Sequence, residues 1–199
     1  ADGNSSEDTS HLDALARVQN AEPSCPNVEI EGLMSRAAFE KSLKNSFKML
    51  RREPLSVAFV SINNLRSLEK THGDKVAKLL LRVVGRKVLE NVRVEDFATR
   101  YGNSFALLLI GSDVEGARLA LQRVVDVFVD ARYTIANGEK VALSLNAGIA
   151  GQSPDLRFES HDAILQSAAA ALAAAKRDGA YVVQCETPDS HLSGLKSVR

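Results

Sequence analysis

The sequence predicts an α/β (α+β) domain in which helices flank a mixed central sheet. Stretches with helical apolar spacing alternate with an almost wholly apolar, β-branched run at 55–62. Two turn signals, Gly102-Asn103 and Asn137-Gly138, indicate antiparallel hairpins. Helices that alternate with strands and hairpins are typical of a mixed sheet covered by helices.

The first half of the domain is expected to contain a helix, a central strand and a second helix. The first helix covers 36–52, and Pro54 ends it because proline clashes with a continuing helix. Residues 55–62 (LSVAFVSI) form a buried strand. A second amphipathic helix extends over about 65–92, with a break near Gly73. The apolar positions of these helices are Phe39, Leu43, Phe47 and Leu50, and Val76, Leu79, Leu80, Val83, Val84 and Val88.

The next elements are a hairpin and a helix. Strands at 96–101 and 105–110 flank Gly102-Asn103, where glycine supplies a positive φ. The capping-box pattern Ser-Asp-Val-Glu at 112–115 then opens a helix. Its expected inner side is Ala117, Leu121, Val124, Val125 and Phe128.

The last elements are a second hairpin, an alanine-rich helix and a strand. Asn137-Gly138 turns RYTIA back into VALSLNAGIA. Ser160 caps a helix that reaches Asp178 and stops at Gly179, and AYVVQC follows as a strand. The alanine run at 168–175 leaves a slim helix face, which suits either close packing on the sheet or a docking groove for a partner helix.

The length of 199 residues suits one domain with tails. We expect a flexible lead and linker helix at 1–27, the domain at 28–186 and a tail at 187–199. The lead contains a short apolar helical stripe at 11–20. This stripe is either the end of a linker helix from an upstream module or a turn that packs on the domain.

The charge and cysteine content narrow the function classes. The chain has 25 acidic and 25 basic residues, which argues against broad binding of nucleic acid or of an anionic membrane, although one local basic pocket remains compatible. Cys25 and Cys185 are expected to be unrelated thiols. No apolar run is long enough for a membrane span, and the N-terminus has no secretion signal. We therefore expect a cytoplasmic protein, whose chain could be a piece of a longer one.

Four stretches resemble the GGDEF (diguanylate cyclase) family. They are EIEGLMSRAAF (29–39), the segment 54–80, RVEDFATRYGNSFALLL (93–109) and SAAAALAAAKRDGA (167–180). Their order and separations match the family across 28–186. The resemblance implies a palm-like fold.

The resemblance also implies that the catalytic residues are missing. The family holds two divalent metals on carboxylates, but its first metal aspartate falls on Ser61. The second lies in the signature, where this chain has Asn103 and Ser104 and is one residue short. Neither residue type supplies the charge that a hard cation needs. We expect no catalytic residue, no metal and no cofactor, and hence no enzyme.

The positions that recognise the substrate in this family also differ. The two guanine-contacting positions fall on Glu69 and Lys78, and lysine has only donors to offer the guanine edge. The phosphate-facing lysine is kept as Lys176, but the arginine four residues later is Ala180.

The resemblance also implies that one site of the family is retained, namely the inhibitory site for cyclic di-GMP. It consists of Arg93, Asp96 and, from the following helix, Arg123. Aspartate can accept from the guanine Watson–Crick edge, and arginine can bond bidentately to guanine or phosphate. The alternative is a surface ion pair of Arg93 and Asp96, worth ~0–1 kcal/mol.

The sequence therefore predicts a catalytically inactive cyclic di-GMP receptor or regulatory module in bacterial signalling. Its expected partners are cyclic di-GMP, a protein or neighbouring signalling domain, and a second copy in a homodimer. The alternatives are an interaction scaffold that binds no nucleotide, a domain that binds GTP without turnover, and an active cyclase with unusual ligands.

Overall fold

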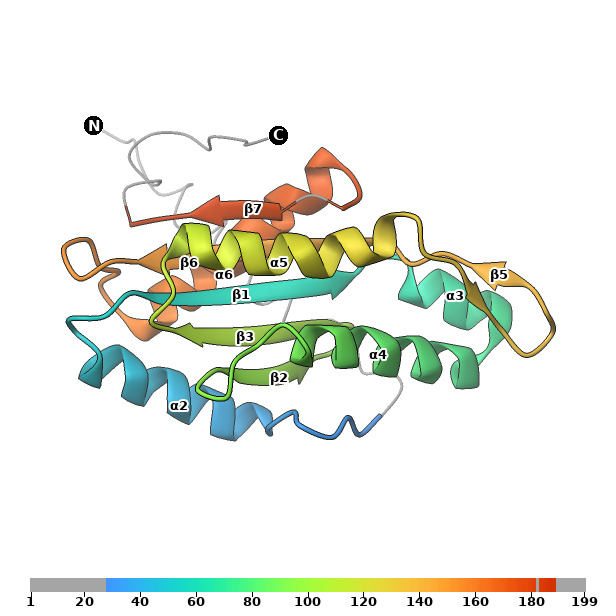
Figure 1. Ribbon diagram of the computed structural model, residues 1–199, viewed down its shortest axis with the longest axis horizontal. Coiled ribbons are helices and arrows are strands. Elements are labelled where there is room, and N and C mark those ends of the chain that lie inside the picture. The colour runs from blue at the N-terminus through green and yellow to red at the C-terminus, as the bar shows by residue number, and fades with distance from the viewer. Residues whose placement is uncertain (1–27, 182, 189–199) are drawn as a thin grey trace, which may run out of the picture.

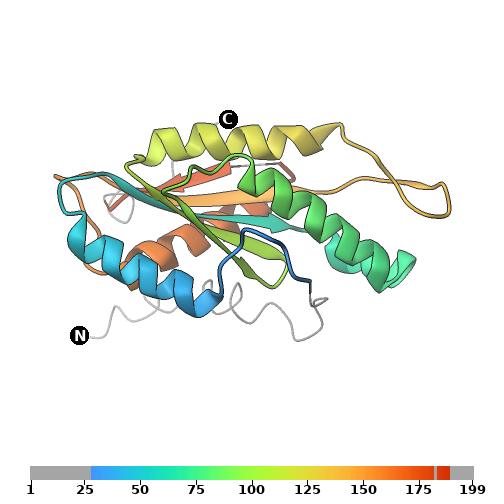
Figure 2. The same cartoon turned by 60° about the horizontal axis from the view of Figure 1, so that its bottom comes forward.

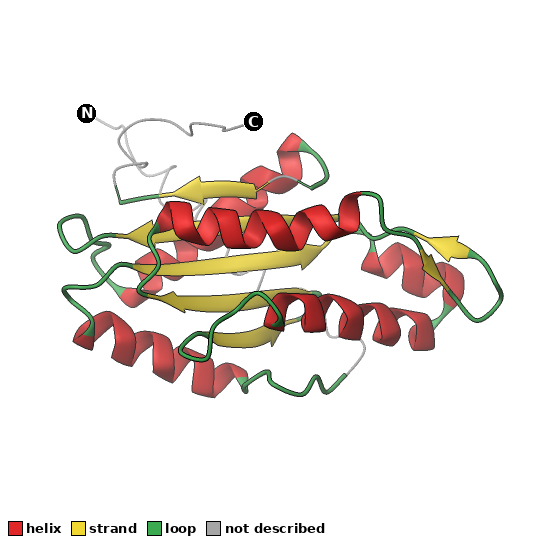
Figure 3. Ribbon diagram, in the orientation of Figure 1, coloured by secondary structure: helices red, strands yellow, loops and turns green. Residues whose placement is uncertain are grey.

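The computed structural model describes residues 28–181 and 183–188. Its main feature is a five-stranded sheet in the order β2-β3-β1-β6-β7, with helices on both faces, and a separate two-stranded sheet pairs β4 with β5 (Figures 1 and 3). The α/β (α+β) prediction is confirmed. The strands are β1 (Leu55–Ile62), β2 (Phe97–Tyr101), β3 (Ser104–Ile110), β4 (Tyr133–Thr134), β5 (Lys140–Val141), β6 (Leu145–Gln152) and β7 (Val183–Glu186). The helices are α2 (Arg36–Met49), α3 (Leu65–His72), α4 (Asp74–Leu89), α5 (Val114–Val129) and α6 (His161–Asp178).

The central strand β1 is buried along its whole length, as its apolar sequence predicts. It pairs antiparallel with β3 on one side and with β6 on the other. At its C-terminal end Ser61 lies between Ser104 of β3 and Asn146 of β6. This register sets three polar side chains in a row across the sheet.

The two faces of the sheet have separate cores because β-strand side chains alternate. Helices α4 and α5 cover the face that carries Val60 and Leu107. Helices α2 and α6 cover the opposite face, with Phe59 and Leu108. Figure 2 shows α2 lying along one margin of the molecule.

Two local predictions along the first half are confirmed. The helical region after β1 breaks at Gly73, which has φ 88° and separates α3 from α4. Gly102 has φ 60°, and Tyr101 pairs with Ser104 across the two-residue turn. A positive φ at the first turn residue alone is the type II′ hairpin geometry.

The cap of α5 differs from the prediction by one residue. Asp113, not Ser112, is the N-cap, and its carboxylate accepts the N–H of Gly116 at 2.8 Å. Both residue types can cap a helix. Ser112 stays in the loop, where its carbonyl accepts the hydroxyl of Ser56 at 2.9 Å. All five predicted inner residues of α5 are buried.

The second hairpin is shorter than predicted. Only two residue pairs join β4 to β5. The rest of the predicted return strand becomes β6, because it pairs with β1 in the main sheet. The cap of α6 agrees with the prediction, since the Ser160 hydroxyl accepts the N–H of Ala163 at 3.0 Å.

The alanine run of α6 packs against the sheet and does not form a docking groove. A Cβ added to Gly148 of β6 would lie 2.0 Å from the backbone nitrogen of Leu172. Alanine on the helix and glycine on the strand allow this close approach. The predicted stripe at 11–20 and Cys25 lie outside the described residues, as does the tail from 189 onward.

Candidate functional site

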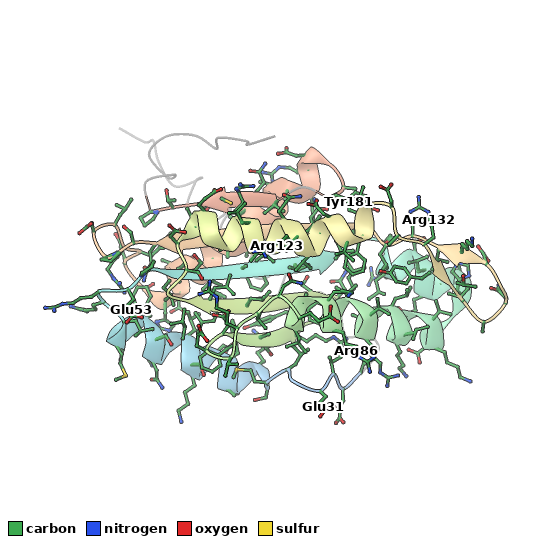
Figure 4. The ribbon with its side chains drawn as sticks, in the orientation of Figure 1. Glu31, Glu53, Arg86, Arg123, Arg132 and Tyr181 are labelled. Carbon is green, nitrogen blue, oxygen red and sulfur yellow. The ribbon has the colours of Figure 1, made fainter. Side chains whose placement is uncertain are left out.

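The three residues predicted to form a receptor site line one cavity. Arg93, Asp96 and Arg123 border a space of about 340 Å³ between the loop after α4, the end of β3 and the first half of α5. Figure 4 shows Arg123 on α5. The remaining lining residues are Glu90, Asn91, Val92, Leu109, Ser112, Gly116, Ala117 and Ala120.

Asp96 organises the loop that carries Arg93. One carboxylate oxygen accepts the backbone N–H of Arg93 at 2.8 Å, and the other accepts the N–H of Ile110 at 3.0 Å. The N–H of Asp96 in turn donates to the Arg93 carbonyl at 3.1 Å. The loop is therefore closed and tied to the last residue of β3. Each carboxylate oxygen keeps a further lone pair for another donor.

The two arginines are available at the cavity rim. Both are exposed, and Arg123 donates through Nε to the carbonyl of Leu119 at 3.2 Å. The other charged lining residue, Glu90, pairs with Lys87 at 2.7 Å. Small residues on the first turns of α5, such as Gly116, leave room between helix and loop. The arrangement offers guanidinium donors beside carboxylate acceptors.

A second polar site lies at the opposite end of the β2–β3 hairpin. Ser61, Ser104 and Asn146 form a buried row across β1, β3 and β6. Among the described residues, the Ser61 hydroxyl has no hydrogen-bond partner. Asn146 donates to the carbonyls of Ala175 and Gly179 at 3.0 and 2.7 Å, and so ties β6 to the end of α6.

Asparagine side chains extend this network towards the surface. Asn63 donates to the amide oxygen of Asn146. Asn103, in the hairpin turn, donates to the carbonyl of Ile62 at 2.8 Å. Sequence reasoning missed Asn63 and Asn146. The available signal was a polar residue within or directly after an apolar strand. Only the register of β1 with β6 brings Asn63 and Asn146 together.

The surface above this network is a cavity of about 370 Å³. The described residues that line this cavity are Asn63, Asn103, Ser144, Asn146, Lys176, Gly179 and Ala180, and Lys176 is the charged residue among them. The Lys176 side chain is exposed, while partial desolvation of its ammonium lowers the pKa of Lys176. Across 28–181 and 183–188, no three His, Cys, Asp or Glu residues form a group that could hold a metal ion.

Glu69 and Lys78, which the resemblance aligns with guanine-contacting positions, do not line this cavity. Glu69 lies on α3 and Lys78 on α4. The ammonium of Lys78 pairs with Asp74 at 2.6 Å, one helical turn away.

The family model for the diguanylate cyclase, GGDEF domain matches residues 29–181. The chain belongs to the GGDEF family. Diguanylate cyclase DosC of Escherichia coli (strain K12) is 32% identical over 130 residues, which are 63% of this chain and 27% of DosC. Diguanylate cyclase A of Treponema denticola is 23% identical over 129 residues, 65% of this chain and 34% of that protein. This GGDEF chain thus spans about a quarter to a third of the length of these relatives.

Solved GGDEF domains share the fold. The GGDEF domain of DgcB from Caulobacter crescentus, in complex with c-di-GMP, matches with a TM-score of 0.73 and 21% identity over 82% of this chain and 96% of that chain. The diguanylate cyclase SiaD from Pseudomonas aeruginosa, in complex with its activator SiaC, matches with a TM-score of 0.70 and 20% identity over 90% and 67% of the two chains. No described helix is both long and apolar enough to cross a bilayer.

Proposed function

We propose that this GGDEF domain is a cyclic di-GMP receptor without cyclase activity, acting as a regulatory module in bacterial signalling. The observation that carries the proposal is the cavity shared by Arg93, Asp96 and Arg123, which come from a loop and a helix. If the Arg-x-x-Asp sequence had occurred by chance, there would be no reason for a second arginine, from α5, to border the same cavity. The relatives named as diguanylate cyclases and the DgcB complex with c-di-GMP support the choice of ligand.

The chemistry of the cavity suits a guanine dinucleotide. The free lone pairs of Asp96 can accept from guanine N1–H and N2–H₂. The guanidinium groups of Arg93 and Arg123 can pair with phosphate or with guanine O6 and N7, and can stack on a base. Since Asp96 is already fixed by two backbone N–H groups, its acceptors are oriented before the ligand arrives.

The other end of the hairpin does not suit the reaction that the relatives' names describe. A divalent metal requires carboxylate or similarly hard oxygen ligands. Ser61 and Ser104 supply only hydroxyls at the aligned positions, and Asn103, whose amide nitrogen donates to the Ile62 carbonyl, can offer only a neutral amide oxygen. This donor set does not fit two magnesium ions, so we assign no catalytic step to it.

The positions that would recognise the GTP substrate are also unsuited to it. Lys78 is paired with Asp74 and has no acceptor for the guanine edge. Ala180 stands at the aligned arginine position. We expect no cyclic di-GMP to form from GTP with magnesium or manganese. Steady product in a chromatographic assay, absent from a mock purification, would contradict the inactivity.

Calorimetric titration with cyclic di-GMP tests the receptor function. Wild-type protein should bind, and Arg93→Ala should weaken binding by about tenfold or more, since hydrogen bonds to charged groups are worth ~1.5–3 kcal/mol. Lys176→Ala, in the other cavity, is the matched control and should bind as the wild type does.

Two outcomes would change the assignment. No heat with wild-type protein at micromolar ligand would leave a scaffold that binds protein partners without nucleotide. Loss of binding in Lys176→Ala with normal binding in Arg93→Ala would move the ligand to the other cavity. If the wild-type protein binds cyclic di-GMP as proposed, light scattering would measure ligand-dependent association into a homodimer or with a neighbouring signalling domain.

A further inference from the structure

Although the chain has no formal net charge, its basic residues are concentrated in one segment. Residues 36–52, which comprise α2 and the three residues after it, hold six basic residues and one acidic residue, a formal net charge of +5. The rest of the chain therefore carries −5. The single acidic residue, Glu40, pairs with Arg36 at 2.9 Å and accepts the hydroxyl of Tyr101 at 3.1 Å. No carboxylate of this segment is left to neutralise the other five cations.

These five cations line the outer side of α2 and its C-terminal extension. Phe39 and Leu43 are buried and define the inner side of the helix. Lys41, Lys44 and Lys48 follow at spacings of three and four residues on the other side, and all three are exposed. We define the α2 cationic face as Lys41, Lys44, Lys48, Met49, Arg51 and Arg52.

Nothing in the described part of the chain neutralises this face. No described carboxylate lies within ion-pair distance of its lysines or arginines. Met49, which lies between Lys48 and Arg51 in the sequence, is 82% exposed, although methionine side chains usually pack inside proteins. Glu53 is the acidic residue next in the sequence, and Figure 4 shows it at one end of the molecule.

The end of α2 is also held firmly in place. Arg157 donates to the carbonyls of Phe47, Leu50 and Arg51 at 3.0, 3.1 and 3.2 Å. Its guanidinium also lies over the Phe47 ring, 5.3 Å from the ring centre. The unpaired carbonyls at the helix end are thereby satisfied. The face is consequently a rigid element and not a flexible basic tail.

We propose that the α2 cationic face docks the domain on an anionic lipid surface. Basic side chains attract acidic headgroups at ~1 kcal/mol each, and an exposed apolar residue among them can enter the headgroup boundary. Nucleic acid is the less suitable partner. None of the exposed large apolar residues described is aromatic, so the face has no base-stacking platform.

Docking through α2 leaves the receptor cavity accessible. Helix α2 packs on the sheet face that α6 shares, whereas α5, which borders the cavity, covers the other face. A lipid surface in contact with Lys41 and Lys48 would therefore lie on the side away from Arg123. The docking proposal does not depend on cyclic di-GMP binding.

Vesicle co-sedimentation of the whole chain tests the docking. The probes are vesicles of phosphatidylglycerol with phosphatidylcholine, and vesicles of phosphatidylcholine alone. The test variant is Lys41→Gln/Lys44→Gln/Lys48→Gln. The matched control, Lys75→Gln/Arg82→Gln/Arg86→Gln, removes the same charge from exposed positions of α4. All six side chains are exposed, and thermal melting will verify that both variants fold.

The proposal predicts binding to anionic vesicles and not to neutral ones. The α2 variant should lose about a hundredfold in partition, from three contacts at ~1 kcal/mol each, and the α4 variant less than about threefold. Met49→Ser should lose a smaller, salt-independent part of the binding.

Four results would overturn the proposal. The first is that wild-type protein does not bind anionic vesicles at low salt. The second is that it binds neutral vesicles equally well. The third is that both triple variants lose the same amount of vesicle binding, which would indicate an effect of net charge alone. The fourth is tighter binding of a DNA duplex than of vesicles at the same salt, with loss in the α2 variant, which would identify a nucleic-acid surface.

Discussion

Asp96→Ala should destabilise the ligand-free domain as well as weaken ligand binding. The carboxylate accepts the N–H of Arg93 at 2.8 Å and that of Ile110 at 3.0 Å. Alanine leaves both N–H groups without this acceptor and releases the loop from the end of β3. Since Asp96 is only half-buried, water can replace part of what is lost.

The size of the effect follows from these two bonds. A hydrogen bond to a charged group contributes ~1.5–3 kcal/mol, and access of water to the loop reduces the sum of the two to about 2 kcal/mol. For a chain of this size that corresponds to a decrease in melting temperature of about 4–8 °C.

Thermal and urea unfolding without ligand, followed by circular dichroism, measures this effect. Glu95→Ala is the matched control, because Glu95 is an exposed carboxylate of the same loop. It should change the free energy of unfolding by less than about 0.5 kcal/mol. Equal melting temperatures for Asp96→Ala and Glu95→Ala would refute the structural role of Asp96.

This result would also decide how binding data are interpreted. A loss of binding in Asp96→Ala would combine the missing acceptor with a released loop. Arg93→Ala keeps its backbone N–H and removes only the exposed guanidinium, so it should melt as the wild type does. Loss of binding in Arg93→Ala at an unchanged melting temperature is therefore the cleaner evidence for the site.

Three further predictions concern stability. Gly102→Val should cost about 1–3 kcal/mol because valine resists the φ of 60° in the hairpin turn, and an unchanged melting temperature would mean another turn geometry. Gly148→Ala should cost about 3 kcal/mol or more, since its Cβ would meet the Leu172 backbone at 2.0 Å, and a loss below about 1 kcal/mol in urea unfolding would show that α6 can move away. Burial raises the pKa of Glu186 from 4.5 to about 7, so the folded state binds more protons between these values and stability should fall by up to about 3 kcal/mol as pH rises through them. Urea unfolding across this range should show the fall in wild type and not in Glu186→Gln, and parallel curves would contradict it.

Local signals in the sequence were sufficient for most of the fold. The run at 55–62 became β1 with unchanged bounds because every side chain of a central strand is buried. The helix break at Gly73 and the helix cap at Ser160 depend only on residues nearby in the sequence, so both could be predicted. The cap of α5 could not, because Ser112 and Asp113 are adjacent residues that can both cap a helix, and the pattern alone does not distinguish them.

The same distinction between local and distant contacts applies to the candidate sites. The resemblance to the GGDEF family predicted that Arg93, Asp96 and Arg123 form one site, and these three residues line one cavity. The sequence could not show that Asp96 holds two backbone N–H groups, because one of them belongs to Ile110 across the hairpin. Nor could it predict the Asn63–Asn146 contact, which depends on the register of β1 with β6.

The receptor cavity and the α2 cationic face can be tested separately because the sheet lies between them. The cavity is built on α5 and the loop after α4, and α2 packs on the opposite face. Substitutions at distant sites without shared partners usually have additive effects. Arg93→Ala should therefore leave vesicle binding intact, and the lysine variant of α2 should leave the cyclic di-GMP titration intact. If ligand binding altered vesicle binding, the coupling would have to cross the sheet, because strands such as β1 and β3 contribute side chains to both cores.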